Sequence, residues 1–292
     1  MKKILVTGAN GQLGNEIRLL EAANKEFGFV FTDVAELDIC NAEAVDSFVE
    51  GNSIDIIINC AAYTAVDKAE DDKDLCNRIN AEAPANLASA AAKHGAKLVH
   101  VSTDYVFDGT AHTPYNEQCA PCPASVYGRT KLAGEDNIRK ILPSAIIIRT
   151  AWLYSTFGNN FVKTMIRLGK EKNALNVVYD QIGSPTYAAD LAAAIMRICN
   201  HIASDENPDK FGGTYHFTDE GVCSWYDFTI EIHKNAGISS CKVSPILSGQ
   251  YPAKAPRPHY SVLDKAKIKD TFGIEIPHWT VSLQHCIAKL GQ

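Results

Sequence analysis

The sequence predicts an α/β fold, a doubly wound parallel sheet covered by helices on both faces, followed by a smaller C-terminal lobe. Short apolar runs alternate with longer helical patterns through the first half of the chain. The apolar runs are continuous, as expected of parallel strands that are buried on both faces. After about residue 150 the alternation loosens and prolines and glycines gather in several places, which indicates turns and loops.

The elements of the first half are predicted in chain order from these patterns. Strands are predicted over residues 4–6, 29–31, 55–59, 97–102 and 145–148, and helices over 12–24, 83–94 and 127–140. Strand–helix–strand units cross over with a right hand, so these elements arrange as a doubly wound sheet.

Composition and charge exclude several classes of protein. The formal charge is −6, with 28 Lys and Arg against 34 Asp and Glu, which argues against a nucleic-acid binder that neutralises phosphates. No apolar run reaches the roughly 18 residues of a membrane helix. The N-terminus, Met1-Lys2-Lys3, runs into a short apolar strand without the longer apolar stretch of a signal peptide. We therefore expect a cytoplasmic protein that interacts with neither nucleic acid nor membrane.

Nine cysteines fit a reducing compartment if they are free thiols. Cys119 and Cys122 form a CxxC pair, but the sequence has no second pair at similar spacing to complete a zinc site. Pro121 and Pro123 place this stretch in a loop, whereas a redox motif usually opens a helix. No metal-ligand set is expected within the candidate site.

A glycine-rich turn follows the first predicted strand. Gly8, Gly11 and Gly14 form GxxGxxG between that strand and the first helix, where Gln12 and Leu13 begin the helix. The first glycine allows a sharp turn, the second lets backbone approach a pyrophosphate, and the third lets the helix pack closely on the sheet. The free N–H groups of the helix N-terminus suit phosphates. A plain tight turn is the alternative, but the strand–turn–helix context favours a Rossmann-like dinucleotide site.

The sequence predicts a different role for each of two parts of the chain, and the glycine-rich turn lies in the first. Residues 1–150 are predicted to form the dinucleotide-binding domain. Residues 151–292 are predicted to form mainly a substrate-binding lobe, with part of that segment returning to the first domain.

Other candidate cofactor contacts follow the later strands. Asp33 comes after the second strand, where an acid can bind the adenosine ribose and favour NADH, although a solvated loop acid is the alternative. No basic residue stands beside it in the sequence to favour a 2′-phosphate. Further candidates are Asp38 and Ile39, which could border the adenine, and Ala62, Tyr63 and Thr64 after the third strand.

A possible proton donor lies at the start of the last predicted helix. Tyr127 and Lys131 share one helix face because they are four residues apart. A ketone that accepts a hydride needs a proton, and a nearby ammonium lowers the pKa of a phenol. Ser102 and Thr103 end the fourth strand on opposite sides, so one of them is expected to face the cleft. We select Thr103 as the hydrogen-bond donor to the carbonyl, against the alternative that both hydroxyls cap the strand.

These motifs together resemble the extended short-chain dehydrogenase/reductase family. The matching stretches are 7–14 (TGANGQLG), 59–70 (NCAAYTAVDKAE), 102–109 (STDYVFDG), 127–135 (YGRTKLAGE), 149–154 (RTAWLY) and 180–186 (DQIGSPT). They run from the start to about residue 190, and a looser match continues to the end. The set is far more specific than any one motif.

The resemblance implies an activity and roles for the residues. The activity is reduction of the C4 ketone of dTDP-4-dehydro-6-deoxy-L-mannose to dTDP-L-rhamnose, with NADH or NADPH as cofactor. The resemblance carries over Tyr127 as the proton donor and as a cofactor contact. It carries over Lys131 as the residue that binds the cofactor ribose and lowers the phenol pKa. Thr103, Asp104 and Trp152 become substrate contacts, although a core aromatic is the alternative for Trp152.

Certain members of this family also form homodimers around a magnesium ion held by glutamates. Glu16 stands in a comparable place, and Asp190 is the candidate to replace a second glutamate. A C-terminal glutamate is missing, since the chain ends Lys289-Leu290-Gly291-Gln292.

Two other functions remain open from the sequence. Some relatives of this fold bind a dinucleotide as regulatory subunits without catalysis, although such a subunit need not keep the Tyr–Lys–Thr set. Others epimerise or dehydrate a nucleotide sugar with a tightly held oxidised cofactor. Asp104, next to the candidate hydroxyl, occupies the position where a dehydratase usually has an acid.

Overall fold

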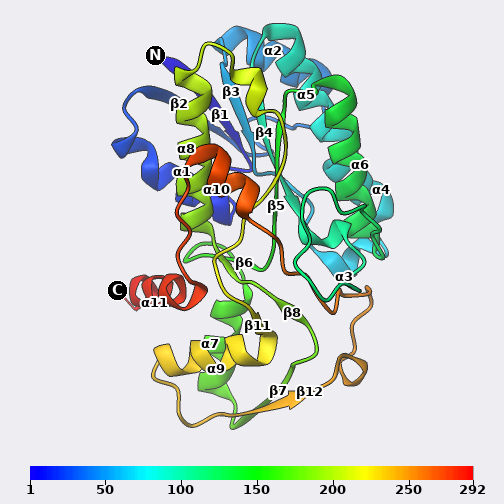
Figure 1. The fold of residues 1–292 in the computed structure, drawn as a ribbon, viewed down its shortest axis with the longest axis vertical. Coiled ribbons are helices and arrows are strands. Elements are labelled where there is room, and N and C mark those ends of the chain that lie inside the picture. Colours follow the sequence, from blue (N-terminus) through cyan, green and yellow to red (C-terminus); the bar gives the residue numbers. More distant parts are fainter. Residues whose placement is uncertain (292) are drawn as a thin grey trace.

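The computed structural model describes residues 1–291 and contains a central sheet of six parallel strands in the order β10-β5-β4-β3-β1-β2 (Figure 1). The strands are β1 (Lys2–Thr7), β2 (Phe27–Thr32), β3 (Ile56–Asn59), β4 (Lys97–Thr103), β5 (Ile146–Thr150) and β10 (Gly213–His216). The predicted α/β class with a doubly wound parallel sheet is confirmed.

Helices cover both faces of this sheet (Figure 1). The helices of the first half are α1 (Gln12–Leu20), α2 (Ala42–Asn52), α3 (Val66–Ala69), α4 (Lys73–Asn77), α5 (Ala83–His94) and α6 (Val126–Ile141). Those that follow are α7 (Phe161–Glu171), α8 (Ala188–Ser204), α9 (Trp225–Asn235), α10 (Ala266–Phe272) and α11 (Trp279–Leu290). Within residues 1–291, none of them combines the length and the apolar character that crossing a membrane requires.

Alternate residues of each strand supply the two halves of the core. In β1, Ile4 and Val6 pack with α1, α8 and α10, whereas Leu5 packs with α2, α5 and α6. The strands therefore bury both faces, which is why their sequences read as continuous apolar runs. The carboxyl ends of β1, β3 and β4 meet at one edge of the sheet, where Thr7 and Thr103 lie.

The second half of the chain contains more helices and strands than its sequence suggested. The longest helix among the described residues, α8, has 17 residues and packs against α1. The strand β10 extends the central sheet beside β5, and α10 packs near it. Both α8 and β10 were missed, as was α2 in the first half, and the first helix ends at Leu20 in place of the predicted residue 24. The chain thus returns to the central sheet after residue 150, while the division into two domains at that residue stays a prediction.

The remaining segments form the smaller lobe, drawn below the sheet in Figure 1. Its short strands are β6 (Leu153–Tyr154), β7 (Ala174–Val178), β8 (Ile182–Gly183), β9 (Thr186–Tyr187), β11 (Cys223–Ser224) and β12 (Lys242–Ile246). They pair as β6 with β9, β7 with β12, and β8 with β11. Helices α7, α9 and α11 enclose an aromatic core that includes Tyr154, Phe228 and Trp279. This lobe forms one wall of the cleft described next.

Candidate active site

The glycine turn adopts the geometry that a pyrophosphate cradle needs. Gly8 has a φ of +63°, and a Cβ there would come within 2.7 Å of the Ala61 backbone. A Cβ on Gly14 would come within 2.5 Å of the Ala9 Cα, so the helix can approach the sheet only with glycine at this position. Helix α1 begins directly after Gly11, which leaves the N–H groups of its first turn at the cleft.

A cavity of about 390 Å³ extends from this turn toward β2. Its lining includes Gly8, Gly11, Asp33, Asp38, Ile39 and Ala62. Asp33 accepts a hydrogen bond from the Asn10 N–H at 3.0 Å, which fixes the acid beside the turn. The cavity has the place and lining that an adenosine moiety would need.

Arg78 lines the same cavity and was missed by the sequence reasoning. It lies 45 positions after Asp33 in the printed numbering, so no local pattern could connect the two. Asp33 has no basic neighbour in the sequence, but in the folded chain Arg78 lines the same cavity. An exposed guanidinium here suits a 2′-phosphate, and the combined lining is compatible with either NADH or NADPH.

A second cavity of about 520 Å³ adjoins the first at the glycine turn. Its lining brings together the candidates Gly8, Gly11, Gln12, Leu13, Ala62, Thr64, Thr103, Asp104, Tyr127, Lys131 and Trp152. Two candidates line neither cavity. Gly14 serves helix packing, and the Tyr63 hydroxyl points away and donates to Asp72 at 3.0 Å.

Helix α6 positions the candidate proton donor. Ser125 caps this helix by accepting from the Gly128 N–H, and Tyr127 lies in its first turn with its ring edge-on to Tyr105. Burial raises the pKa of Tyr127 above its ordinary value, and the hydrogen bond with Thr103 opposes that rise. Tyr127 therefore holds its proton at neutral pH, as a donor must.

Lys131 lies one turn further along α6 and is buried. Its Nζ donates to the Val101 carbonyl at 2.7 Å and lies 3.4 Å from the His100 Nε2. Burial lowers the pKa of Lys131 from 10.5 to about 8. The expected lowering of the Tyr127 pKa is not found, because burial of the phenol raises that pKa and the one opposing contribution comes from Thr103.

The two hydroxyls at the end of β4 point to different partners. Ser102 donates to the Glu135 Oε1 at 2.6 Å, inside a buried ion pair with Arg149. Thr103 lies beside Tyr127 and donates to the Asp104 Oδ1 at 2.9 Å. Burial raises the pKa of Asp104 to about 6, while hydrogen bonds from Thr103 and Ser261 oppose the rise. Thr103 thus lies where a carbonyl-binding hydroxyl is expected, but its one proton is donated to Asp104 in this structure and must turn to reach a carbonyl.

Trp152 lines the same cavity as the glycine turn. Its φ is 51°, a left-handed conformation that is unusual for a bulky residue and is commonly found at functional sites. Its ring stacks on Trp225 with centroids 3.6 Å apart. Gly183 packs under this ring, because a Cβ there would come within 2.7 Å of the Trp152 Cε2. The indole is therefore held in place and still faces the cavity.

Asn160 is another cavity residue that the sequence reasoning missed. It donates from Nδ2 to the Gln12 Oε1 at 2.9 Å and caps helix α7. This bond ties the smaller lobe to the first turn of α1. An asparagine before a helical pattern is a capping signal, but its contact with residue 12 is set by the tertiary fold.

The residues considered for a magnesium ion do not fit one. Glu16 is buried and accepts from the Ser155 hydroxyl at 2.6 Å, and burial raises its pKa. Asp190 adds negative charge nearby, and Lys289 adds a positive charge that acts on both carboxylates. Mg²⁺ requires oxygen ligands in octahedral geometry, whereas this set is two carboxylates with a lysine.

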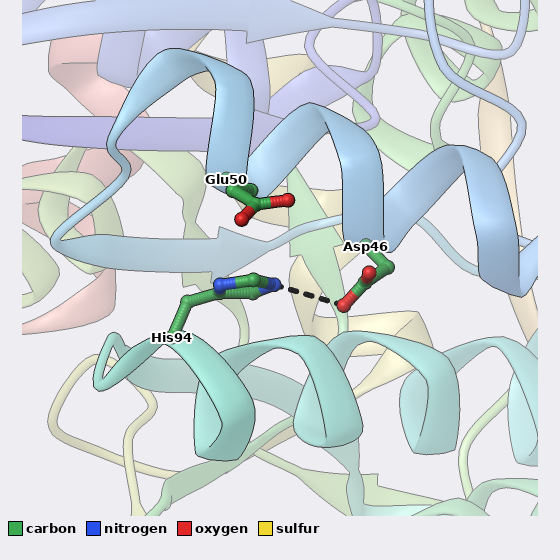
Figure 2. Close-up of side chains that lie close together, drawn as sticks. All are labelled: Asp46, Glu50 and His94. Carbon is green, nitrogen blue, oxygen red and sulfur yellow. Dashed lines mark hydrogen bonds and ion pairs between the residues drawn. The ribbon is translucent and has the colours of Figure 1, made fainter.

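Within residues 1–291, one group of three metal-type side chains occurs, formed by Asp46 and Glu50 of α2 with His94 of α5 (Figure 2). Asp46 pairs with His94 at 2.9 Å and with Lys93 at 2.7 Å. None of the three lines either cavity. The lysine already neutralises the carboxylate, so the group is a surface ion-pair network.

A parallel sheet with a glycine turn, and a cleft holding a tyrosine, a lysine and a threonine, define a nicotinamide-dependent reductase of the short-chain dehydrogenase/reductase type. The chain belongs to the family described as "RmlD substrate binding domain", whose model matches residues 1–292.

Relatives of known identity agree with this class. The dTDP-4-dehydrorhamnose reductase of Aggregatibacter actinomycetemcomitans is 41% identical over 290 residues, covering 98% of each chain. A solved dTDP-4-dehydrorhamnose reductase from Clostridium acetobutylicum is 46% identical, with a TM-score of 0.93 over 99% of this chain and 100% of that one. The Bacillus anthracis reductase, solved in complex with NADP, is 41% identical with a TM-score of 0.91 over the same shares. The predicted resemblance is confirmed.

Proposed function

We propose that the protein reduces the C4 ketone of dTDP-4-dehydro-6-deoxy-L-mannose to dTDP-L-rhamnose, with NADPH or NADH. The observation that carries this proposal is the convergence of Tyr127, Lys131 and Thr103 on one cavity beside the glycine turn. Relatives that match almost the full chain are named for this reaction. Arg78 and the NADP complex of the Bacillus anthracis relative support use of NADPH.

The residues present fit a dinucleotide. Side chains at Gly8 and Gly14 would collide with backbone, and the turn they make leaves the N-terminus of α1 open to phosphates. Gly11, Gln12 and Leu13 would border the pyrophosphate, and Asp33, Asp38 and Ile39 the adenosine. When bound, the cofactor supplies the hydride.

The side chains of the cleft supply the rest of the chemistry. The Thr103 hydroxyl orients the carbonyl, and Tyr127 donates its proton to the oxygen as negative charge develops there. Lys131, one helical turn after Tyr127, carries positive charge and offers its remaining N–H bonds to a ribose. Trp152 contacts the sugar ring, with Asp104 beside Thr103.

The test is turnover of the dTDP-linked ketosugar with each reduced cofactor in parallel, followed by nicotinamide absorbance. Oxidation that depends on the ketosugar, with dTDP-L-rhamnose as product, is expected. Dinucleotide binding without oxidation would contradict the proposal and favour a regulatory subunit. Sedimentation of the same sample tests the predicted homodimer.

One observation favours a second function, dehydration or epimerisation of a nucleotide sugar. Asp104 is buried, lies next to Thr103 and has a pKa of about 6, as an acid group of a dehydratase would. Such an enzyme recycles its hydride, so it would be purified with oxidised cofactor tightly bound and would consume no reduced cofactor. Release of the cofactor by denaturation and its identification by absorbance distinguish the two functions.

A further inference from the structure

A row of buried polar side chains, none of which lines the cavity, ends at Lys131, which does line it. Thr7 of β1 donates to the Asn59 Oδ1 at 2.7 Å. The Asn59 Nδ2 lies 2.9 Å from the His100 Nδ1, and the His100 Nε2 lies 3.4 Å from the Lys131 Nζ. Asn59 and His100 are each 0% exposed, so water cannot substitute for these contacts. His100, the last member of this row before Lys131, is therefore one of the polar groups that surround the lysine amine.

The orientation of the Asn59 amide is fixed by the backbone. The Ala61 N–H, which can only donate, lies 3.1 Å from the Asn59 Oδ1. The oxygen must therefore face Ala61, and the amide nitrogen must face His100. A carboxamide nitrogen only donates, so the His100 Nδ1 accepts and carries no proton.

The tautomer of His100 follows from this contact. Burial and the nearby lysine charge hold the pKa of His100 well below its ordinary value, so the ring is neutral. A neutral imidazole with an unprotonated Nδ1 carries its proton on Nε2. That N–H points toward the Lys131 Nζ, which is itself a donor when charged.

Other groups around Lys131 stabilise its charged form, whereas the His100 N–H disfavours it. Glu135 of α6, Cys76 of α4 and Cys60 after β3 each favour the charged lysine. Glu135 is engaged by Arg149 and by Ser102, which reduces its pull on the amine. The Val101 carbonyl accepts one N–H of Lys131. The His100 N–H is the neighbour whose polarity opposes the charge.

We propose that His100 is a positioning residue for the reductase, held by Asn59 as the Nε2–H tautomer so that its N–H opposes the charge on Lys131 and leaves the amine's remaining donors to the cavity. The lysine thereby releases a proton more readily than it would beside an accepting imidazole nitrogen. This inference rests on the proposed function only for its catalytic meaning, because the tautomer is a property of the free protein.

The test is nitrogen NMR of the free protein with labelled histidine and lysine, where His100→Gln and Lys131→Met variants identify the signals. An unprotonated Nδ1 and a protonated Nε2 are expected for His100 from pH 6 to 9, together with a Lys131 pKa near 8. A protonated Nδ1, or an imidazolium in this range, would overturn the proposal. A protein that shows the expected tautomer but does not oxidise NADH or NADPH with the ketosugar refutes the proposed function alone.

Two variants test whether Asn59 determines the tautomer of His100. In Asn59→Asp the new carboxylate oxygen accepts from the Nδ1, so the tautomer should reverse and the Lys131 pKa should rise by about one unit or more, a tenfold change in proton affinity. Thr7→Val is the matched control, because it removes the other bond to Asn59 but leaves the Ala61 N–H in place. Its tautomer should be unchanged. Retention of the Nε2–H tautomer in Asn59→Asp, or a reversal in Thr7→Val, would overturn the proposal.

Discussion

Replacing Tyr127 by Phe removes one hydroxyl and leaves the ring. The ring keeps its edge-on contact with Tyr105, whose centroid lies 5.4 Å away. Thr103 keeps its bond to the Asp104 Oδ1. The change in folding stability should therefore be about 1 kcal/mol, the usual net contribution of one hydrogen bond.

The loss of rate should be much larger than this loss of stability. A positioned acid contributes about 10²–10⁴ in rate, which corresponds to about 3–5 kcal/mol of transition-state stabilisation. Burial raises the pKa of Tyr127, so the wild-type phenol is protonated throughout the neutral range and the deficit should be similar from pH 6 to 8. Cofactor affinity should change less than turnover, since the proposed role of the hydroxyl is to protonate the substrate oxygen.

The assay is steady-state oxidation of the reduced cofactor with saturating ketosugar. Tyr215→Phe is the matched control, because its hydroxyl donates to the Phe211 carbonyl at 2.8 Å in the core. That variant should lose about 1 kcal/mol of stability and keep its turnover. Unchanged turnover in Tyr127→Phe would refute its assignment as the proton donor.

Three further outcomes are expected. Glu135→Leu should lose about 3–5 kcal/mol in urea unfolding because it strands the buried Arg149; a neutral result would show that the pair is dispensable. Gly183→Ala should raise the KM for the sugar, since its Cβ would displace Trp152. Gly51→Ala is the control and should leave the KM unchanged, because a Cβ there meets nothing within 4 Å. Equal KM values in the two variants would exclude Trp152 from the substrate site. The pKa of Lys131 is lower in the folded than in the unfolded state, so the unfolded chain binds more protons and stability should rise by about 3 kcal/mol from pH 8 to 10.5. Lys131→Met should lack that rise, and an identical pH dependence in both proteins would contradict burial of the charge.

The sequence predicted the five strands of the first half because strand burial is a local signal. It also predicted α1, α5 and α6 but missed α2. Helix α5 has the predicted bounds, residues 83–94. The strand β10 was missed because it has four residues and pairs with β5, more than 60 positions earlier. Its four residues acquire strand character only from that pairing.

The candidate site was predictable where motifs are compact. Gly8, Tyr127 and Thr103 each belong to a short pattern with a physical rationale. Arg78 and Asn160 have none, since the fold brings them to the cavities from outside any motif. His100 lies only two positions before Ser102, yet its contacts with Asn59 and Lys131 come from other elements, so no spacing rule could show them.

The place of β10 in the sheet has a consequence for how the chain behaves as a whole. A fragment ending at residue 150 would leave β5 with a bare edge and α1 without its neighbour α8, and such edges pair with other copies. Residues 1–150 produced alone should therefore aggregate. Unfolding should remove both halves in one cooperative transition, because the polypeptide crosses between them several times instead of once.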